Sequence, residues 1–382
     1  MAEDRRASST FEHLWSTVEH WAEEFPALSD SRLHRKGMSR KVERRFHIAS
    51  SVLLALIAFG WMWTIATGRT DASGLSTTTA IISRALTDSR APSAAYLTDL
   101  ALGLVAPARG ESGRLRARVE DPGAPLSRDT LPAGTVATFS TGHAAESTAV
   151  LAAPKRSGVW SLALAVGNAI RPVADFSLIT LKPASEKRAG KIGLYYIGNW
   201  PSARTSGGVK YQPPRGFIEV TREQQNTLLS DHFRLKDFFP HDQANVWPKY
   251  IVVEMKLVDK LELILAELEK QGIPTAGVKV MSGFRTPQYN SGVGDTRGRA
   301  SLSRHMYGDA ADIFIDNDGN GNMDDLNKDG KVNTSDARVI LAAANRVEAA
   351  HPSLIGGVGV YPGTSAHGPF THIDTRGYPA RW

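Results

Sequence analysis

The distribution of hydrophobic and polar residues divides the 382-residue chain into four segments. Residues 1–47 are polar and charged, whereas 48–66 read IASSVLLALIAFGWMWTIA, an uncharged run long enough to cross a hydrocarbon core. Residues 69–215 are rich in Ala, Ser, Thr, Gly and Pro and hold only short apolar runs. From residue 216 to 382 the apolar patterns are longer. We therefore predict a tail, a transmembrane helix, a tether with a small β-rich module, and a compact domain.

The charges that flank the apolar run predict its orientation. Seven Lys or Arg lie between Arg32 and Arg45, against the single acid Glu43, and the first basic residue beyond the run is Arg69. The positive-inside rule places residues 1–47 in the cytoplasm and everything after about residue 68 in the periplasm or outside the cell. The alternatives are a cleaved signal peptide, disfavoured because no small-x-small cleavage site follows, and a buried core helix, which rarely has such a one-sided basic flank.

Helical and strand-like patterns mix in the last segment. NVWPKYIVVEMKLVDKLELILAELEKQGIP predicts a long helix with Pro248 near its start and Gly272–Pro274 at its end. Its apolar stripe consists of Val258, Leu261, Leu265 and Leu268. ARVILAAANRVEAA predicts a second helix, and GVKVMSGFR, ADIFID, GGVGVYP and FTHIDT predict strands. This order predicts an α+β domain with a largely antiparallel sheet.

In the β-rich segment, DFSLITL (Asp175–Leu181) and KIGLYYIG (Lys191–Gly198) are strand-like runs separated by a charged turn, which predicts a hairpin.

The composition limits the functions to consider. The formal charge of +6 is modest and partly local, so no nucleic-acid partner is expected. The chain has no cysteine, which excludes disulfides, thiolate zinc sites and cysteine nucleophiles.

Two short histidine–aspartate pairs are candidates for a metal site. His305 and Asp312 lie seven positions apart with Gly308 between them, and His372 and Asp374 lie two apart. Imidazole and carboxylate are zinc ligands, and a catalytic zinc takes three of them and keeps a fourth position open. If the two predicted strands are neighbours, all four side chains could converge on one ion. The alternative is a set of ordinary structural or surface polar groups.

The residues around these pairs carry a resemblance. SRHMYGDAAD, followed about 60 residues later by FTHID and preceded by SGFRTPQYN, resembles the zinc D,D-peptidases of bacterial cell walls, the D-alanyl-D-alanine carboxypeptidases and murein endopeptidases. The family pattern S-x-H-x-x-G-x-A-x-D is complete, and the resemblance extends over residues 217–382. It implies a zinc ion held by His305, Asp312 and His372, and peptidoglycan as the substrate.

The resemblance also implies roles for two neighbouring residues and leaves the general base open. Arg285 would steer a substrate carbonyl or carboxylate, or form a structural salt bridge, and Ser303 would lie at the substrate-binding edge. The carboxypeptidases place a glutamate three residues before the last zinc histidine, where this chain has Pro369. The HID motif resembles the endopeptidase branch instead.

The candidate base is then Asp374, with His367 second. Asp374 would orient or deprotonate the attacking water, or else fix the ring of His372. Because the family glutamate is absent, a non-catalytic wall-binding or scaffolding protein that keeps the fold and its metals is the alternative function.

An acidic insert at residues 316–336 has calcium-binding spacing. From Asp325 to Asp336 it resembles the dockerin-type EF-hand loop, with Gly330 at the sharp sixth position. The expected Ca²⁺ ligands are Asp325, Asn327, Asp329, Lys331 (through its carbonyl), Asn333 and Asp336. A weaker loop upstream comprises Asp316, Asp318, Asn320 and Asp324, with Asn327 in its twelfth position. The alternatives are a solvated acidic turn and a calcium-sensing role.

Overall fold

The computed structural model describes Ser51 and residues 106–126, 131, 134–141, 144–149, 151–166, 169–202, 204–206, 209–292 and 299–382. The chain divides into two compact units, Met1–Arg90 and Ala91–Trp382, and apart from Ser51 all described residues belong to the second. The predicted tail and the predicted transmembrane helix lie outside the described residues, Ser51 excepted. Within the described ranges, no helix combines the length and the apolar character needed to cross a membrane.

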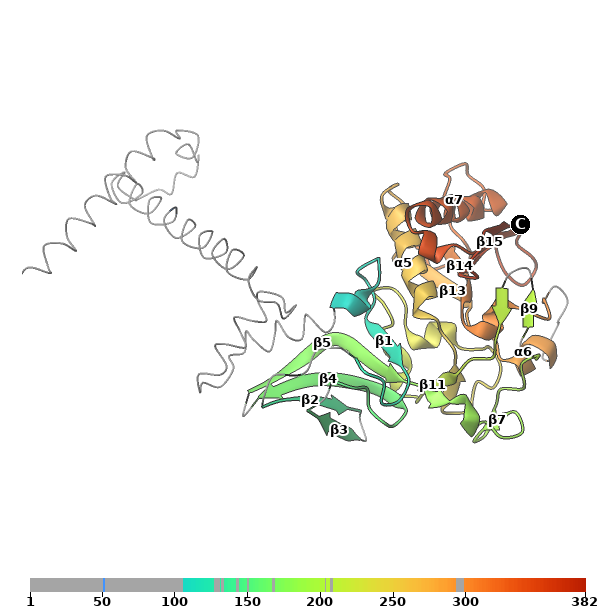
Figure 1. Cartoon of the computed structure of the whole chain (residues 1–382). Helices are drawn as coiled ribbons and strands as arrows, with labels where there is room; N and C mark the ends of the chain where they lie inside the picture. The colour runs from blue at the N-terminus through green and yellow to red at the C-terminus, as the bar shows by residue number, and fades with distance from the viewer. Residues whose placement is uncertain are drawn as a thin grey trace, which may run out of the picture. The chain divides into compact units, whose positions relative to one another are not determined.

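The C-terminal part is built on a five-stranded sheet with the strand order β13-β14-β16-β15-β17 (Figure 1). The strands are β13 (Val278–Ser282), β14 (Ala310–Ile315), β15 (Gly357–Tyr361), β16 (Phe370–Asp374) and β17 (Ala380–Arg381). All neighbours are antiparallel except β15 and β17. The predicted α+β class and the four predicted strands are confirmed.

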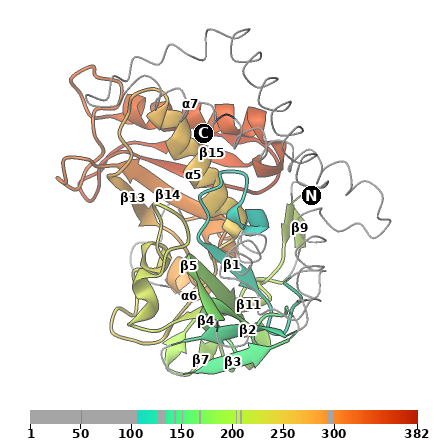
Figure 2. The same ribbon diagram turned by 90° about the vertical axis from the view of Figure 1, so that its left-hand side faces the viewer.

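Two helices, α5 (Met255–Glu269) and α7 (Thr334–Ala350), pack against each other, and α7 lies on β15 and β16 (Figures 1 and 2). The predicted stripe of α5 is fully buried, because apolar residues three and four apart share one helix face. The predicted start near Pro248 is wrong. Lys249–Ile251 instead forms strand β12, consistent with the preference of aromatic and β-branched residues for extended backbone.

Strand β12 belongs to a three-stranded sheet with β11 (Gly216–Val220) and β6 (Lys182–Pro183). The remaining short elements are α6 (Pro287–Gly292), strands β9 (Arg204–Ser206) and β10 (Val209–Tyr211), and the 3₁₀ turns η3 (Ala106–Arg109), η4 (Ala184–Glu186), η5 (Gln224–Asn226), η6 (Leu235–Phe238), η7 (Arg304–Tyr307) and η8 (Pro352–Leu354).

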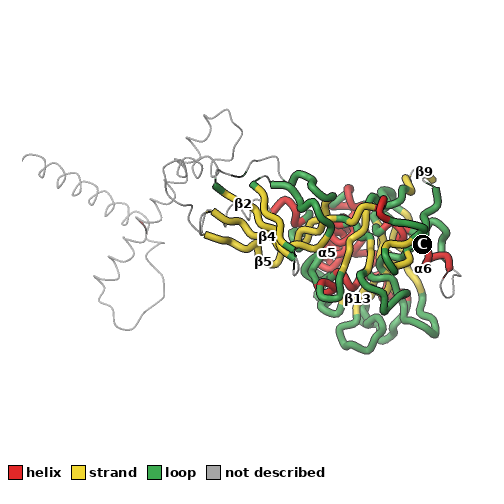
Figure 3. Tube along the Cα trace, turned by 90° about the horizontal axis from the view of Figure 1, so that it is seen from below, coloured by secondary structure: helices red, strands yellow, loops and turns green. Residues whose placement is uncertain are grey.

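The β-rich segment holds a second five-stranded sheet, with the order β1-β5-β4-β2-β3. Its strands are β1 (Ala117–Glu120), β2 (Thr135–Ser140), β3 (Ala145–Thr148), β4 (Gly158–Val166) and β5 (Ala169–Thr180). Figure 3 shows β2, β4 and β5 side by side. The predicted hairpin is wrong, since β5 pairs with β4 and β1, while Lys191–Ile192 (β7) pairs with Tyr195–Tyr196 (β8). Gly193, at φ 56°, allows that tight two-residue turn.

One hydrophobic core includes residues from both sides of position 216. Ile179 of β5 and Leu181, the residue that follows β5, belong to the same buried cluster as Phe217, Ile251 and Leu261. The described parts of 106–215 and 216–382 therefore share apolar contacts. The predicted domain boundary at residue 216 stays a prediction.

Candidate metal centre

The sheet register brings the predicted ligands together. Ser282, Asp312, His372 and Gly359 are paired across β13, β14, β16 and β15, so they form one row across the sheet. Side chains paired in this way lie on the same face, with Cβ atoms about 5 Å apart. Asp312 and His372 are thus neighbours because of strand pairing, although 60 residues separate them.

The third ligand comes from the turn before β14. His305 lies in η7, which ends at Gly308 with φ 75°. A Cβ atom at Gly308 would lie 2.6 Å from the carbonyl oxygen of Val252, so only glycine fits there. Arg304 donates to both carboxylate oxygens of Asp309 at 3.0 Å, which ties the start of the turn to the residue after it.

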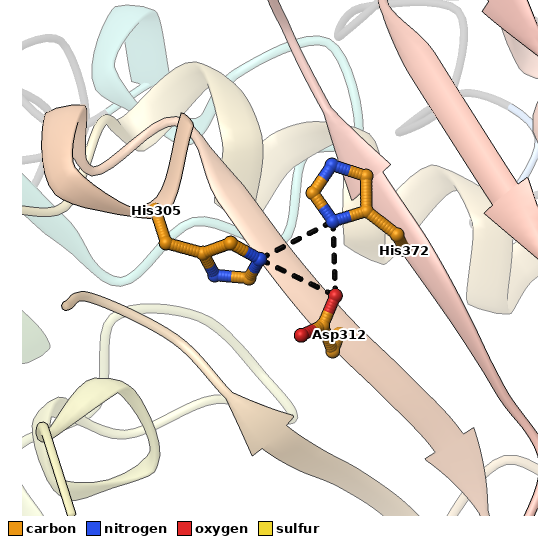
Figure 4. A group of neighbouring side chains, drawn as sticks. All are labelled: His305, Asp312 and His372. Carbon is orange, nitrogen blue, oxygen red and sulfur yellow. Dashed lines mark hydrogen bonds and ion pairs between the residues drawn. The ribbon is translucent and has the colours of Figure 1, made fainter. Parts of the chain in front are cut away.

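The three side chains form a compact triangle of donor atoms (Figure 4). His305 Nε2 lies 3.2 Å from His372 Nδ1 and 3.3 Å from Asp312 Oδ1, and His372 Nδ1 lies 2.9 Å from Asp312 Oδ1. Tetrahedral zinc with bonds of about 2.0–2.1 Å places its ligand atoms about 3.3 Å apart. Two imidazoles and one carboxylate at these separations therefore fit a zinc ion.

Each histidine is held so that the nitrogen within the triangle is available. His305 Nδ1 lies 2.7 Å from the carbonyl oxygen of Gly283 and can donate to it, which leaves Nε2 as the ligand atom. His372 Nε2 lies 3.1 Å from Asp374 Oδ2, which leaves Nδ1. Partners of this kind set the tautomer and the ring orientation of metal-binding histidines.

Burial and mutual contacts shift the pKa values of all three groups. Burial alone would raise the pKa of Asp312, but the charge of His305 and hydrogen bonds with both histidines hold it well below its ordinary value. Burial lowers the pKa of His305. Burial also acts to lower the pKa of His372, yet its hydrogen bonds with Asp312 and Asp374 raise it to about 9. The centre therefore keeps an ionised carboxylate in a buried position, where a cation is stabilised.

Asp374 does not join the triangle, so the predicted convergence of four side chains is not found. Its carboxylate is fully buried and contacts the far nitrogen of His372. Oδ1 accepts from the backbone N–H groups of Gly357 (2.7 Å) and Arg376 (3.0 Å), and the guanidinium of Arg376 binds both oxygens. This geometry fits the alternative in which Asp374 fixes the ring of His372.

Arg285 forms an ion pair with a predicted zinc ligand. Its Nη2 donates to Asp312 Oδ2 at 2.8 Å, and its Nε donates to Ser282 Oγ at 2.8 Å. Asp312 thus presents Oδ1 to the histidines and Oδ2 to Arg285. The side chain of Arg285 keeps 17% of its surface exposed. This contact is the structural salt bridge predicted as the alternative role of Arg285. The exposed part of the guanidinium is still accessible to a substrate.

The other two predicted site residues lie on the segments that lead into η7 and β16. Ser303 is buried and precedes η7 in the N-cap position, without a side-chain capping bond. His367 is half-buried, with Nδ1 2.8 Å from the carbonyl oxygen of Gly368 and its ring edge-to-face with Phe370. Ser303 therefore adjoins the turn that carries His305, and His367 lies on the segment that leads into β16.

The acidic insert forms two consecutive turns. In the predicted calcium loop, the N–H of Gly330 donates to Asp325 Oδ2 (2.7 Å) and the N–H of Lys331 donates to Asp329 Oδ1 (2.9 Å). Asn333 and Asp336 then form the capping box that starts α7. In the described part of the chain, two groups of three His, Asp or Glu side chains could hold a metal. They are His305, Asp312 and His372, and Asp316, Asp318 and Asp324 in the upstream loop.

Three contacts of this region were not expected from the sequence. Arg376 binds Asp374, and it could have been suspected only from its closeness to the HID motif. Lys260 is completely buried in α5, where its Nζ donates to Glu348 Oε1 (2.6 Å) and to the carbonyl of Asp374 (2.7 Å). The Trp382 ring lies 5.3 Å from the His372 ring and fills the space beside Gly359. No local signal marked the last two contacts.

Comparison with known proteins agrees with this site. Residues 240–374 match the family model described as Peptidase M15, and this range includes all three residues of the triangle. No curated protein and no solved structure matches the chain. The match supports a metallopeptidase in this part of the chain, in a family whose members depend on zinc.

Proposed function

We propose that the chain is a membrane-anchored zinc peptidase that hydrolyses amide bonds in peptidoglycan stem peptides or cross-links. One observation carries the proposal. His305, Asp312 and His372 present donor atoms 2.9–3.3 Å apart, within a segment that matches Peptidase M15. A zinc ion held there would polarise a substrate carbonyl and activate water for attack on it.

The protein residues would hold this centre rigid. Asp374 and Arg376 fix the ring of His372, and Arg285 fixes the carboxylate of Asp312. A ligand set held within a fraction of an ångström by such partners needs little reorganisation when the substrate binds.

Substrate binding would use the open parts of the same groups. Arg285 keeps part of its guanidinium exposed, and its planar donors suit a carbonyl or a carboxylate of a stem peptide. Ser303 would line the edge of the site beside His305. With Asp374 occupied by His372 and Arg376, His367 is the remaining candidate for the general base.

The preference for an endopeptidase rests on two sequence features. Pro369 stands where the carboxypeptidases carry their glutamate, and the motif His372-Ile373-Asp374 resembles the endopeptidase branch. The same absent glutamate supports the second candidate function, a non-catalytic wall-binding protein whose metal stabilises the fold.

The proposed location rests on sequence alone. The apolar run 48–66 and its basic flank support a single-pass anchor in the cytoplasmic membrane, with the tail 1–47 inside and the peptidase in the periplasm or outside the cell. Calcium in the loop Asp325–Asp336 would brace the start of α7, which packs on the zinc-bearing sheet.

The test is digestion of purified peptidoglycan by the full chain, with mass spectrometry of the released muropeptides. We expect cleavage that stops with a zinc chelator and falls about a thousandfold or more in His305→Ala, because the ligands act as one unit. The matched control is His351→Ala, since His351 is a histidine bonded to Glu111 outside the triangle. Full cleavage by His305→Ala would refute the zinc peptidase, and zinc binding without cleavage by the wild-type chain would favour the wall-binding protein.

A further inference from the structure

A second group of metal-type ligands lies in the upstream turn of the acidic insert. One carboxylate oxygen from each of Asp316, Asp318 and Asp324 lies within 4.8 Å of the others. Carboxylates this close repel one another, and a bound cation would relieve that repulsion. The insert from 316 to 336 contains six aspartates and two lysines, so its own cations do not balance it.

Asp316 shows that this turn is more than a solvated acidic surface. The residue is only 5% exposed, and its Oδ2 accepts a hydrogen bond from the N–H of Gly321 at 3.1 Å. Its Oδ1 is buried and has no hydrogen-bond partner. A buried carboxylate oxygen without a partner is costly and uncommon in folded proteins, and a bound cation would satisfy it.

The upstream turn repeats the backbone pattern of the predicted calcium loop. Its first, third and fifth residues are Asp316, Asp318 and Asn320, and they accept from the N–H groups two to five positions ahead of each. The same three hydrogen bonds connect the equivalent positions of the downstream loop. Gly321 and Gly330, the sixth residues, have φ 86° and 81°. The two turns therefore place their ligand positions alike.

We propose that the upstream turn is a calcium site, with the side chains of Asp316, Asp318, Asn320 and Asp324 and the carbonyl of Asn322 as ligands. Hard oxygen donors suit Ca²⁺, whose coordination geometry is adaptable, whereas zinc takes the imidazole site and Mg²⁺ demands stricter octahedral geometry. The site does not depend on the proposed peptidase activity, because its occupancy is measured without any substrate.

This calcium site is connected to both sides of the metal centre. Asp316 follows β14, four residues after the ligand Asp312, and its N–H donates to the carbonyl of Gly277 at 2.9 Å. On the other side, a Cβ atom at Gly368 would lie 3.0 Å from Asn322 Oδ1, so the turn packs against the residue after His367. Calcium in the turn would therefore hold the segment that leads into β16.

Isothermal titration of the full chain with CaCl₂, after loading with one equivalent of zinc, tests the site. Asp318, in the third position of the upstream turn, and Asp329, in the fifth position of the downstream loop, are both exposed, so each can be replaced without disturbing the core. We expect Asp329→Ala to retain one bound calcium per chain, and the double variant Asp318→Ala, Asp329→Ala to lose it. The proposal is overturned if Asp329→Ala binds no calcium, or if the double variant binds as much as Asp329→Ala.

Hydrogen–deuterium exchange of the same proteins tests the connection to the metal centre. Calcium should slow amide exchange in residues 363–369 of Asp329→Ala by at least about tenfold, and should have no such effect in the double variant. Equal exchange with and without calcium in Asp329→Ala would refute the connection, even if the site binds calcium.

Discussion

The two five-stranded sheets bury their strands differently. In the N-terminal sheet, the residues of β2 alternate between buried and partly exposed, and β4 follows nearly the same alternation. In the C-terminal sheet, all five residues of β16 and five of the six residues of β14 are buried. The first sheet presents one face to the core, whereas the central strands of the second are covered on both faces.

This difference determines which partners the polar side chains of each sheet need. On the partly exposed face of the N-terminal sheet, Thr138 and Ser140 bond to neighbouring hydroxyls where water is also available. In β16 every polar side chain is buried and needs a protein or metal partner. Thr371 has the carbonyl of Ala337, Asp374 has Arg376, and His372 has Asp374 and Asp312. Substitutions in the two sheets should therefore separate stability from metal binding.

The largest expected effect is on stability alone, in the N-terminal sheet. Phe139 is fully buried in β2, so Phe139→Ala should lower the free energy of unfolding by about 3–5 kcal/mol through lost burial and a cavity. The zinc dissociation constant of the folded protein should stay within about twofold of wild type, since the triangle lies in the other sheet. Denaturant unfolding and zinc titration check both. The control is Thr138→Ala on the partly exposed face, with a change within about 0.5 kcal/mol.

The next effect is on metal binding, in the C-terminal sheet. Asp374→Asn removes the charge that orients His372 and leaves the shape of the side chain nearly unchanged. Loss of such a partner weakens metal affinity about 10–100-fold. Zinc titration against a competing chelator measures this change, and the matched control is Asp259→Asn, since Asp259 is a buried carboxylate that accepts from the backbone N–H groups of Glu111 and Ser112. Unaltered zinc affinity in Asp374→Asn would contradict the orienting role.

The smallest effect concerns a contact between the two regions. The buried Glu262 of α5 hydrogen-bonds His232 at 2.9 Å and lies 3.7 Å from Arg114, which precedes β1. The hydrogen bond with Glu262 raises the pKa of His232 above its ordinary value of 6.5. Because the pKa of His232 is higher in the folded protein than in the unfolded chain, the contact between protonated His232 and Glu262 stabilises the protein fully below pH 6.5. This contribution disappears as the pH rises through the folded-state pKa of His232.

Denaturant unfolding of wild type and His232→Gln between pH 5 and 9 measures this contribution. The difference in stability should be larger at low pH and decrease as the pH rises. A difference that does not change with pH would show that the charge of His232 has no part in the contact.

Local patterns predicted much of the fold and the centre of the site. The stripe of α5 follows from a period of 3.6, and four of the five strands of the C-terminal sheet follow from runs rich in apolar and β-branched residues, signals that short segments carry by themselves. The triangle was predicted from the resemblance of its motifs to the zinc D,D-peptidases, and strand pairing accounts for it, because His305 precedes β14 and Asp312 pairs with His372.

The errors arise where the outcome depends on distant partners. β12 forms a strand because it pairs with β11, and β5 pairs with β4 and with the distant β1, not with the run that begins at Lys191. A period of 2 placed Asp374 on the face of His372, but it could not tell which ring nitrogen the carboxylate would meet. The contact between Lys260 and Glu348 joins residues 88 positions apart, for which the sequence carries no local signal.

Gly359 of β15 pairs with His372 of β16. The indole ring of Trp382 occupies the space that a side chain at position 359 would fill. We therefore expect the emission of Trp382 to respond to the charge on the neighbouring imidazole. A Trp382→Phe comparison separates this signal from the other seven tryptophans of the chain. An indole beside the predicted zinc ligand His372 would thus serve as an internal optical reporter of metal binding at that ring.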